Sequence, residues 1–309
     1  MKVIANRFKV LLPILISPKQ ANFVKGRKIL DRIIVAHEII HSLKIAKVPG
    51  MLMKLDLSKV YEKLSWDFME RMLRAFGFTN QWVNCVRNLA SSAFFSTLVN
   101  DTPSQPFKAT RGIKQGDPLS PFLFILMMEG FGCLVSAKNA SMEIRGLGLH
   151  QDAPAQIHQQ FINDTMLMRY SSVQEARSIK DFLNIFLETS GLEINKEKSQ
   201  VFFFNTTMTT RMNILRILRF KEGTLPNKYL GAPLIASVAK QVSWEEMLEK
   251  MRMKLEDWMY RSLNLPSRLT LVQSVLQAMP TYLFLVLVAP KAVLKKVRDL
   301  QINFLWGGK

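Results

Sequence analysis

The sequence contains few cysteines. Only Cys85 and Cys133 occur among 309 residues, so the chain cannot form a disulfide framework or a zinc site built from several cysteines. We therefore expect no disulfide-linked partner. A low cysteine content also suits a reducing compartment, and we expect a nuclear or cytoplasmic protein rather than a secreted one.

No segment has the pattern of a membrane span or of a signal peptide. The most apolar region, residues 121–135, contains Glu129. Residues 282–289 are too few, because a helix needs roughly 20 apolar residues to cross a bilayer. Charged residues are scattered through residues 1–20, which therefore lack the apolar core of a signal peptide. We expect no membrane partner.

The motifs of several common enzyme classes are also missing. The sequence has no P-loop and no Gly-x-Ser-x-Gly nucleophile elbow. Gly146 and Gly148 begin a Gly-x-Gly pair, but Gln151 stands where the dinucleotide fingerprint needs its third glycine. The sequence therefore supports neither that type of dinucleotide binding nor acyl transfer by such a serine.

Acidic residues are scarce relative to basic ones. The chain has 42 Lys and Arg against 24 Asp and Glu, a net charge of +18, and 48% of its residues are hydrophobic, enough for a sizeable core. Half of the excess lies in residues 1–60. A folded body this basic attracts a polyanion. The basic N-terminal region is either one wall of a nucleic-acid channel or an ordinary solvated surface.

Residue patterns predict a mixed α/β body followed by a helical region that begins near residue 236. Apolar residues at helical spacing predict helices, and alternation predicts strands. The expected helices are 29–43, 65–78, 118–135, 173–190, 268–277 and 293–306. The expected strands are 51–57, 94–99, 161–168 and 200–204, with a hairpin turn at Asn100 and Asp101. Ser243 and Glu246 form a capping box for one more helix.

Two carboxylates stand beside apolar strands. Asp56 lies at the end of the strand expected at 51–57, and Asp164 lies at a turn flanked by apolar residues, within the strand-like segment expected at 161–168. A carboxylate at the mouth of a buried strand needs a partner, and a metal ion is one such partner. Each residue alone could equally be a turn or cap residue. Together, in a basic protein, they favour a Mg²⁺-dependent enzyme of nucleic acids.

A zinc motif competes with this interpretation. Residues 37–41 read His-Glu-Ile-Ile-His, which fits H-E-x-x-H and puts His37 and His41 on one face of a helix. Glu62 is a conceivable third ligand. Nothing else in the sequence builds a zinc cleft, so a zinc hydrolase using His37 and His41 is a remote alternative.

Six ordered blocks of residues, spread over nearly the whole chain, match the motifs of a known protein family. The first block matches Q-x-x-F-x-x-G-R-x-x-x-D at Gln20, Phe23, Gly26, Arg27 and Asp31. Residues 54–66 (KLDLSKVYEKLSW) and 111–122 (RGIKQGDPLSPF) are similar to the next two. Residues 161–165 (FINDT) stand where F-A-D-D-T is usual. Residues 190–199 and 225–234 match the last two. Together, the six blocks resemble the reverse transcriptases of non-LTR (LINE-type) retrotransposons, especially those of plants.

The resemblance implies an α+β right-hand polymerase. Its partial fingers would occupy residues 1–50, its palm with the remaining fingers 51–235, and its α-helical thumb 236–309. The implied reaction is RNA-directed DNA synthesis, in which a primer 3′-hydroxyl attacks the α-phosphate of a dNTP at a two-Mg²⁺ site. The implied partners are an RNA template, a DNA primer and a dNTP.

The resemblance also implies roles for single residues. The catalytic positions are Asp56, Asn163, Asp164 and Lys198, with Asp56 and Asp164 as metal ligands. The nucleotide-binding positions are Leu57 through its carbonyl, Tyr61 as the gate against a 2′-hydroxyl, Gln115 and Gly116. The primer- and template-binding positions are Arg27, Arg111, Lys114, Lys228, Tyr229 and Gly231.

Three departures from the family pattern predict an impaired enzyme. Asn163 stands where the family has the first Asp of a pair, and it offers one neutral oxygen in place of a carboxylate. We expect Asp164 to face the other way, because successive strand residues alternate. Val60 and Glu62 replace the usual Ala and Asp. We expect that the family's upstream fingers segment is missing, as in a truncated copy. The alternative is a catalytically dead nucleic-acid-binding remnant.

Overall fold

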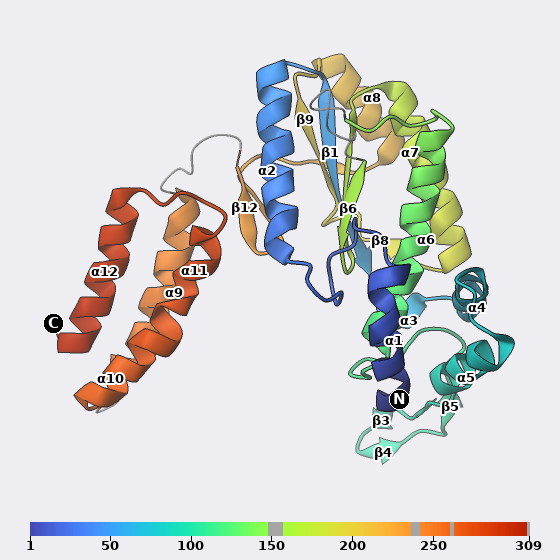
Figure 1. Cartoon of the computed structure of the whole chain (residues 1–309), viewed down its shortest axis with the longest axis horizontal. Helices are drawn as coiled ribbons and strands as arrows, with labels where there is room; N and C mark the ends of the chain where they lie inside the picture. The colour runs from blue at the N-terminus through green and yellow to red at the C-terminus, as the bar shows by residue number, and fades with distance from the viewer. Residues whose placement is uncertain (148–156, 236–241, 260–262, 308–309) are drawn as a thin grey trace. The chain divides into compact units, whose positions relative to one another are not determined.

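The computed structural model describes residues 1–147, 157–235, 242–259 and 263–307 (Figure 1). The chain divides into two compact units. Unit 1 comprises residues 1–32 and 42–223, and unit 2 comprises residues 33–41 and 224–309. This division does not test the expected fingers, palm and thumb boundaries, which stay a prediction.

The helices expected at 29–43, 65–78, 118–135 and 173–190 are present in the structure, and the described part of unit 1 contains four more that the sequence did not predict. The Ser65 hydroxyl accepts from the Phe68 amide at the start of α4, and Gly191, at φ +73°, ends α7. The helices, with α2 running through both units, are α1 (Lys2–Leu15), α2 (Ile29–Ala46), α3 (Val60–Lys63), α4 (Trp66–Ala75), α5 (Asn80–Ser91), α6 (Ser120–Ala140), α7 (Val173–Ser190) and α8 (Met208–Leu218).

Helix α6 is long and apolar enough to cross a membrane by composition alone. Most of that stretch is buried inside unit 1, where Phe124, Met127 and Phe131 share a core with side chains of the sheet and of α7. A core helix of a folded domain meets the same length and composition test. The apolar character of α6 is therefore explained by its packing in this core.

A mixed six-stranded sheet forms the centre of unit 1 (Figure 1). Its strand order is β10-β9-β1-β7-β6, and β8 pairs with the end of β1. Neighbouring strands are antiparallel except β9 and β10. The strands are β1 (Gly50–Ser58), β6 (His158–Phe161), β7 (Asp164–Tyr170), β8 (Glu193–Ile194), β9 (Gln200–Phe204) and β10 (Lys221–Glu222).

Alternation along β1 separates a core face from a polar face. Met53 and Leu55 are buried in the core with α6 and α7, whereas Lys54 and Asp56 lie on the other face and are half-buried. Over these residues, the face of β1 that packs against the helices is apolar, and the opposite face is charged. Asp56 can therefore lie on the polar face of the sheet while β1 still packs in the core through its apolar face.

The single strand expected at residues 161–168 is in fact a hairpin. β6 ends at Phe161, Ile162 and Asn163 form the turn, and β7 begins at Asp164. Ile162 adopts a left-handed φ of +55°. The turn expected at Asp164 thus lies at the two residues before it. The sequence did not place it there, because such turns usually carry glycine or Asn-Gly, and a β-branched residue at positive φ is uncommon.

The hairpin turn expected after residue 99 is confirmed. Asn100 and Asp101 have φ values of +48° and +61°, as a type I′ turn requires. The two short ladders below this turn are β3 (Leu98–Val99) with β4 (Thr102–Pro103), and β2 (Phe94–Phe95) with β5 (Phe107–Lys108). We call residues 93–108 the aromatic hairpin.

The loop between α1 and α2 is attached to the edge strand β6. The Gln160 amide donates to the Lys19 carbonyl at 2.9 Å, and the Ala21 amide donates to the Gln160 carbonyl at 3.2 Å. Inside the loop, the Arg27 guanidinium donates to the carbonyls of Ser17, Gln20 and Ile16 at 2.5 to 2.7 Å. The first sequence block thus forms a loop that supports the strand leading to Asn163.

Unit 2 combines a short hairpin with a helical core. The hairpin pairs β11 (Asn227–Tyr229) with β12 (Ala232–Leu234). The helices are α9 (Val242–Met259), α10 (Leu265–Leu271), the π-helix η1 (Val272–Leu276), α11 (Ala278–Phe284) and α12 (Lys291–Trp306). The helix expected at 268–277 was misplaced, because Asn264 caps an earlier start and the helix then widens into η1. The Ser243 side chain of the expected capping box lies outside the described residues.

Candidate functional site

Two carboxylates stand directly opposite each other on the sheet. The antiparallel register of β1 and β7 pairs Asp56 with Asp164. Residues directly opposite in such a ladder project to the same face, so both side chains lie on the polar face of β1. The Asp56 amide donates to the Ser199 hydroxyl at 3.1 Å, and the Asp56 carbonyl accepts from the Asn195 amide at 2.8 Å. The segment before β9 therefore holds the backbone of Asp56 in position.

Asn163 also reaches this pair. Its Nδ2 donates to Oδ1 of Asp56 at 3.4 Å. The expectation that Asp164 faces away from Asn163 is wrong, because Asn163 belongs to the turn and strand alternation begins only at Asp164. Both residues consequently adjoin Asp56.

The charges around Asp164 oppose one another. Burial raises the pKa of the Asp164 carboxyl, Lys54 and Lys198 lower it, and the neighbouring Asp56 carboxylate raises it further, with a net upward result. Asp56, Asp164 and Lys198 were candidate site residues from the sequence, and the structure brings them together. Lys54 was missed, although its spacing of two from Asp56 in an alternating strand places it on the same face.

Asp56, Asp164 and Asn163 offer the type of oxygen atoms that a hard divalent cation binds, but they offer few of them. Two carboxylates and an amide oxygen are the ligand types that Mg²⁺ prefers, and a cation would offset the repulsion between Asp56 and Asp164. Within the described parts of the chain, no three His, Cys, Asp or Glu side chains are close enough together to hold a metal ion. Asn163 thus stands where a third carboxylate would complete the set.

A cavity of about 660 Å³ lies beside Tyr61 in unit 1. Its wall includes Tyr61, Phe95, Phe107, Arg111, Lys114 and Gln115. The Tyr61 ring stacks against Phe124 with a centroid distance of 5.8 Å, and burial raises the pKa of its hydroxyl. The cavity thus joins four of the predicted nucleotide- and template-binding residues to two aromatic rings of the aromatic hairpin.

Short backbone contacts shape this wall. The Ile113 amide donates to the Tyr61 carbonyl at 2.6 Å, and the Gly112 amide donates to the Leu64 carbonyl at 2.8 Å. Gly112 has a φ of +89°, and a Cβ there would lie 2.7 Å from the carbonyl oxygens of Tyr61 and Glu62. Glycine is therefore required at this position, both for its conformation and for its small size.

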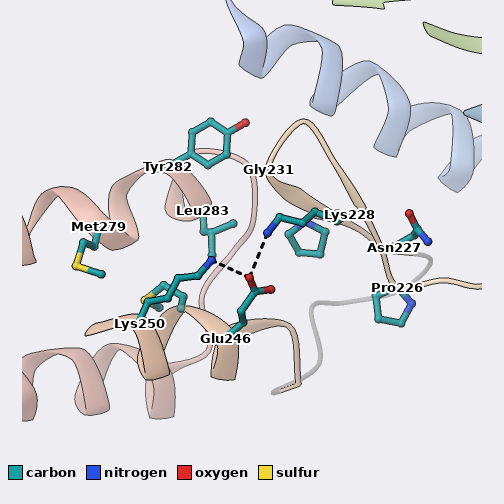
Figure 2. Close-up of a pocket in the computed structure, with 11 residues that line it drawn as sticks. Pro226, Asn227, Lys228, Gly231, Glu246, Lys250, Met279, Tyr282 and Leu283 are labelled. Carbon is teal, nitrogen blue, oxygen red and sulfur yellow. Dashed lines mark hydrogen bonds and ion pairs between the residues drawn. The ribbon is translucent and has the colours of Figure 1, made fainter. Parts of the chain in front are cut away.

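A second cavity, of about 430 Å³, lies within unit 2. Figure 2 shows Lys228 of the β11–β12 hairpin and Lys250 of α9 converging on Glu246, whose Oε1 lies 3.1 and 2.7 Å from the two ammonium nitrogens. The Tyr282 hydroxyl donates to the Leu230 carbonyl at 2.5 Å. Gly231 also lines this cavity, whereas Tyr229 is fully buried, and its contact with the primer or template stays a prediction.

The remaining candidates fall elsewhere. The Arg27 guanidinium is engaged by three backbone carbonyls, which gives it a structural role that its motif did not reveal, and its binding of nucleic acid stays a prediction. Gly116 is exposed beside Gln115 at a φ of +77°. The His37 Nε2–H donates to the Pro233 carbonyl at 3.1 Å, and burial lowers the pKa of His37. No third zinc ligand joins His37 and His41 among the described residues.

Known proteins resemble this chain along its length. A family model described as reverse transcriptase (RNA-dependent DNA polymerase) matches residues 1–234. The "Transposon TX1 uncharacterized 149 kDa protein" of Xenopus laevis is 23% identical over 312 residues, which is 100% of this chain and 23% of the relative. The Pol polyprotein from type-1 retrotransposable element R2 of Popillia japonica is 25% identical over 162 residues, 51% of this chain and 25% of the relative.

Solved structures show the same fold. Telomerase from Candida tropicalis in complex with the TWJ fragment of telomeric RNA superimposes with a TM-score of 0.52 at 14% identity, covering 98% of this chain and 46% of that one. Apo telomerase from the same organism gives 0.50 at 12% identity, covering 98% and 54%. These likenesses concern the fold alone, and they agree with the expected α+β polymerase class.

Proposed function

The chain belongs to the reverse transcriptase (RNA-dependent DNA polymerase) family, and on this premise we propose that it extends a DNA primer on an RNA template. The prediction of a LINE-type reverse transcriptase domain is confirmed by the family and its retroelement relatives. A plant origin and a nuclear or cytoplasmic location stay predictions. The chain spans about a quarter of the length of these relatives, so its activity and its partners are proposals.

The observation that carries the proposal is the pairing of Asp56 with Asp164 across β1 and β7. Two carboxylates of one sheet face, beside two lysines that influence the pKa of Asp164, suit a phosphoryl-transfer centre. The cavity at Tyr61 and Gln115 lies in the same unit, as a nucleotide site requires. A surface basic patch alone would need neither feature.

In the proposed reaction, the primer 3′-hydroxyl loses its proton to solvent while its oxygen forms a bond to the α-phosphorus of a dNTP, and pyrophosphate leaves with the electron pair of the broken P–O bond. Mg²⁺ held by Asp56, Asp164 and the Leu57 carbonyl would stabilise charge on the attacking and leaving oxygens. Tyr61 lies under the sugar and excludes a 2′-hydroxyl. Gln115 and Gly116 contact the nucleotide, and Lys198 neutralises or protonates the pyrophosphate.

The finer architecture belongs to the same proposal. We place the partial fingers at residues 1–50, the palm at 51–235 and the helical thumb at 236–309. Lys228 and Gly231 contact the primer backbone, while Arg111 and Lys114 contact the template. The positive charge of the chain supports such contacts, because each phosphate neutralised by Lys or Arg releases counterions.

Primer extension tests this proposal. An RNA template annealed to a labelled DNA primer is incubated with dNTPs and Mg²⁺ and with one of three proteins: the wild type, Asn163→Asp or Asp56→Asn. We expect slow extension by the wild type and none by Asp56→Asn. We expect Asn163→Asp to extend about tenfold faster, which corresponds to about 1.4 kcal/mol of added transition-state stabilisation.

Each outcome has a distinct meaning. Equally fast extension by the wild type and Asn163→Asp would show that Asn163 does not impair the site. No extension by either, with salt-sensitive binding of the hybrid, would establish the alternative of a catalytically dead nucleic-acid-binding remnant. If the proteins show no extension and do not bind the hybrid, both the proposed polymerase and the nucleic-acid-binding remnant are refuted.

A further inference from the structure

The aromatic hairpin exposes an unusual amount of apolar surface. Phe94, Phe95 and Phe107 are 63%, 46% and 53% exposed, and Leu98 and Val99 at its tip are 70% and 61% exposed. Large apolar side chains clustered on a surface usually mark a binding site. The ladder is nonetheless well defined, because Ser104 accepts from the Thr97 amide and donates its own amide to the Thr97 carbonyl.

The two faces of this hairpin differ. Phe94 pairs with Lys108 and Phe95 pairs with Phe107, so the pleat places one pair on each face. On one face the Lys108 ammonium lies over the Phe94 ring, 4.9 Å from its centroid. On the other, the Phe95 and Phe107 rings lie 6.0 Å apart. Only this second pair lines the cavity beside Tyr61.

Cations border the same aromatic pair. Arg111 and Lys114 line the cavity along with Phe95 and Phe107. The Lys114 ammonium is held beside the hairpin by a 2.8 Å hydrogen bond to the Ser92 hydroxyl. Aromatic rings that stack on bases, beside cations that contact phosphates, are the elements of a single-strand binding surface.

We propose that Phe95 and Phe107 form a stacking platform for unpaired nucleotides of the template, next to the nucleotide cavity. The inference rests on the proposed function and adds a partner surface to it. Within a duplex, the base faces are stacked against neighbouring base pairs, whereas the bases of a single strand can stack on aromatic side chains. The cations favour this occupant over an apolar protein segment, which would have no use for Arg111 and Lys114.

The experiment measures hybrid affinity as a function of template overhang. Fluorescence anisotropy gives the dissociation constants of RNA–DNA hybrids that are blunt or carry two or four unpaired template nucleotides. The proteins are the wild type, Phe95→Ala, Phe107→Ala and Phe95→Trp, with Phe94→Ala as the matched control on the opposite face. All four substitutions are at exposed positions, and circular dichroism checks the fold of each variant.

We expect the wild type to bind the overhang hybrids about tenfold more tightly than the blunt hybrid, the scale of one stacked base. Phe95→Ala and Phe107→Ala should remove this increment and leave blunt-hybrid affinity within about twofold. Phe95→Trp and Phe94→Ala should keep the increment.

Several results would overturn the inference. One is an overhang increment that survives both alanine variants, and another is an equal loss of blunt and overhang binding. Self-association of the wild type that Phe95→Ala abolishes, without any overhang increment, would assign the surface to a protein partner instead. If the wild type binds no hybrid of any kind, the proposed function itself fails. Blunt-hybrid binding with no increment rejects only the stacking platform.

Discussion

The side-chain amide of Asn163 donates a hydrogen bond to Oδ1 of Asp56 at 3.4 Å, across the hairpin that carries Asp164. A neutral donor in this place is compatible with two nearby carboxylates in the absence of metal, because it adds no negative charge. A carboxylate in the same place would repel Asp56 and would need a cation to offset the repulsion. Compared with an Asp at this position, Asn163 thus weakens metal binding but makes the metal-free protein more stable.

Asn163→Asp should therefore make the fold dependent on Mg²⁺. Without Mg²⁺ at pH 7, we expect the free energy of unfolding to fall by about 1 kcal/mol or more, since a hydrogen bond is replaced by a repulsion. Millimolar Mg²⁺ should raise the melting temperature of the variant more than that of the wild type. Differential scanning fluorimetry measures both. Asn184→Asp, the same change at an exposed position of α7, is the control. An identical Mg²⁺ response in all three proteins would contradict the prediction.

Asp164→Asn should remove a pH-dependent loss of stability. Because the folded pKa of Asp164 is raised, the folded state holds this proton more tightly than the unfolded state. The penalty therefore begins as the pH rises past the unfolded pKa of about 3.9 and is complete above the folded pKa. Melting temperatures without Mg²⁺ should diverge across this window, with the variant more stable at neutral pH. Parallel curves for the two proteins would refute the prediction.

Gly112→Ala should be much more damaging than Gly116→Ala. Both glycines have positive φ, but a Cβ at Gly112 would meet two backbone carbonyl oxygens at 2.7 Å, whereas nothing lies within 4 Å of one at Gly116. We expect a loss of about 3 kcal/mol in unfolding free energy for the first and about 1 kcal/mol for the second. Urea denaturation gives both values. Equal losses would mean that conformation alone, and not the contact, requires Gly112.

Arg27→Lys should destabilise the fold even though it keeps the charge. The guanidinium reaches three carbonyls of the α1–α2 loop, which one ammonium cannot match in geometry. We expect a loss of about 2 kcal/mol, and less than about 0.5 kcal/mol for Lys25→Ala at an exposed position of the same loop. Urea denaturation of both variants compares these losses. An Arg27→Lys protein as stable as the wild type would show that the loop does not depend on the hydrogen bonds of the guanidinium to these carbonyls.

Glu246→Gln should strengthen binding of an RNA–DNA hybrid. Glu246 contacts both Lys228 and Lys250, and its removal leaves more positive charge for phosphates. The slope of log K against log salt should steepen by about 1. Stability should change by less than about 0.5 kcal/mol, because these pairs are exposed.

Glu249→Gln is the matched control for this prediction. Glu249 lies on the same helix and pairs with Arg252 at 2.9 Å. An equal change in the salt slope for both variants would show only a general charge effect.

Sequence patterns predicted several of the longer helices and strands but not the geometry of the site. Helix α7 was predicted at its observed bounds because its cap, its apolar period and Gly191 are all local signals. The β6–β7 hairpin was mistaken for one strand because Ile162 makes its turn without a glycine. The orientation of Asp164 was mistaken for the same reason, since a turn residue does not follow strand alternation.

The sequence by itself determined the family, the helical and strand periods and the polar residues worth examining, because motifs, caps and periods are encoded by neighbours along the chain. Only the tertiary structure decided that Asp56 stands opposite Asp164, that Arg27 is engaged by its own loop, and that Phe95 and Phe107 share a cavity with Tyr61. These relations depend on strand register and on packing between segments far apart in the chain. Asn163 and Asp56, for example, are separated by 107 positions.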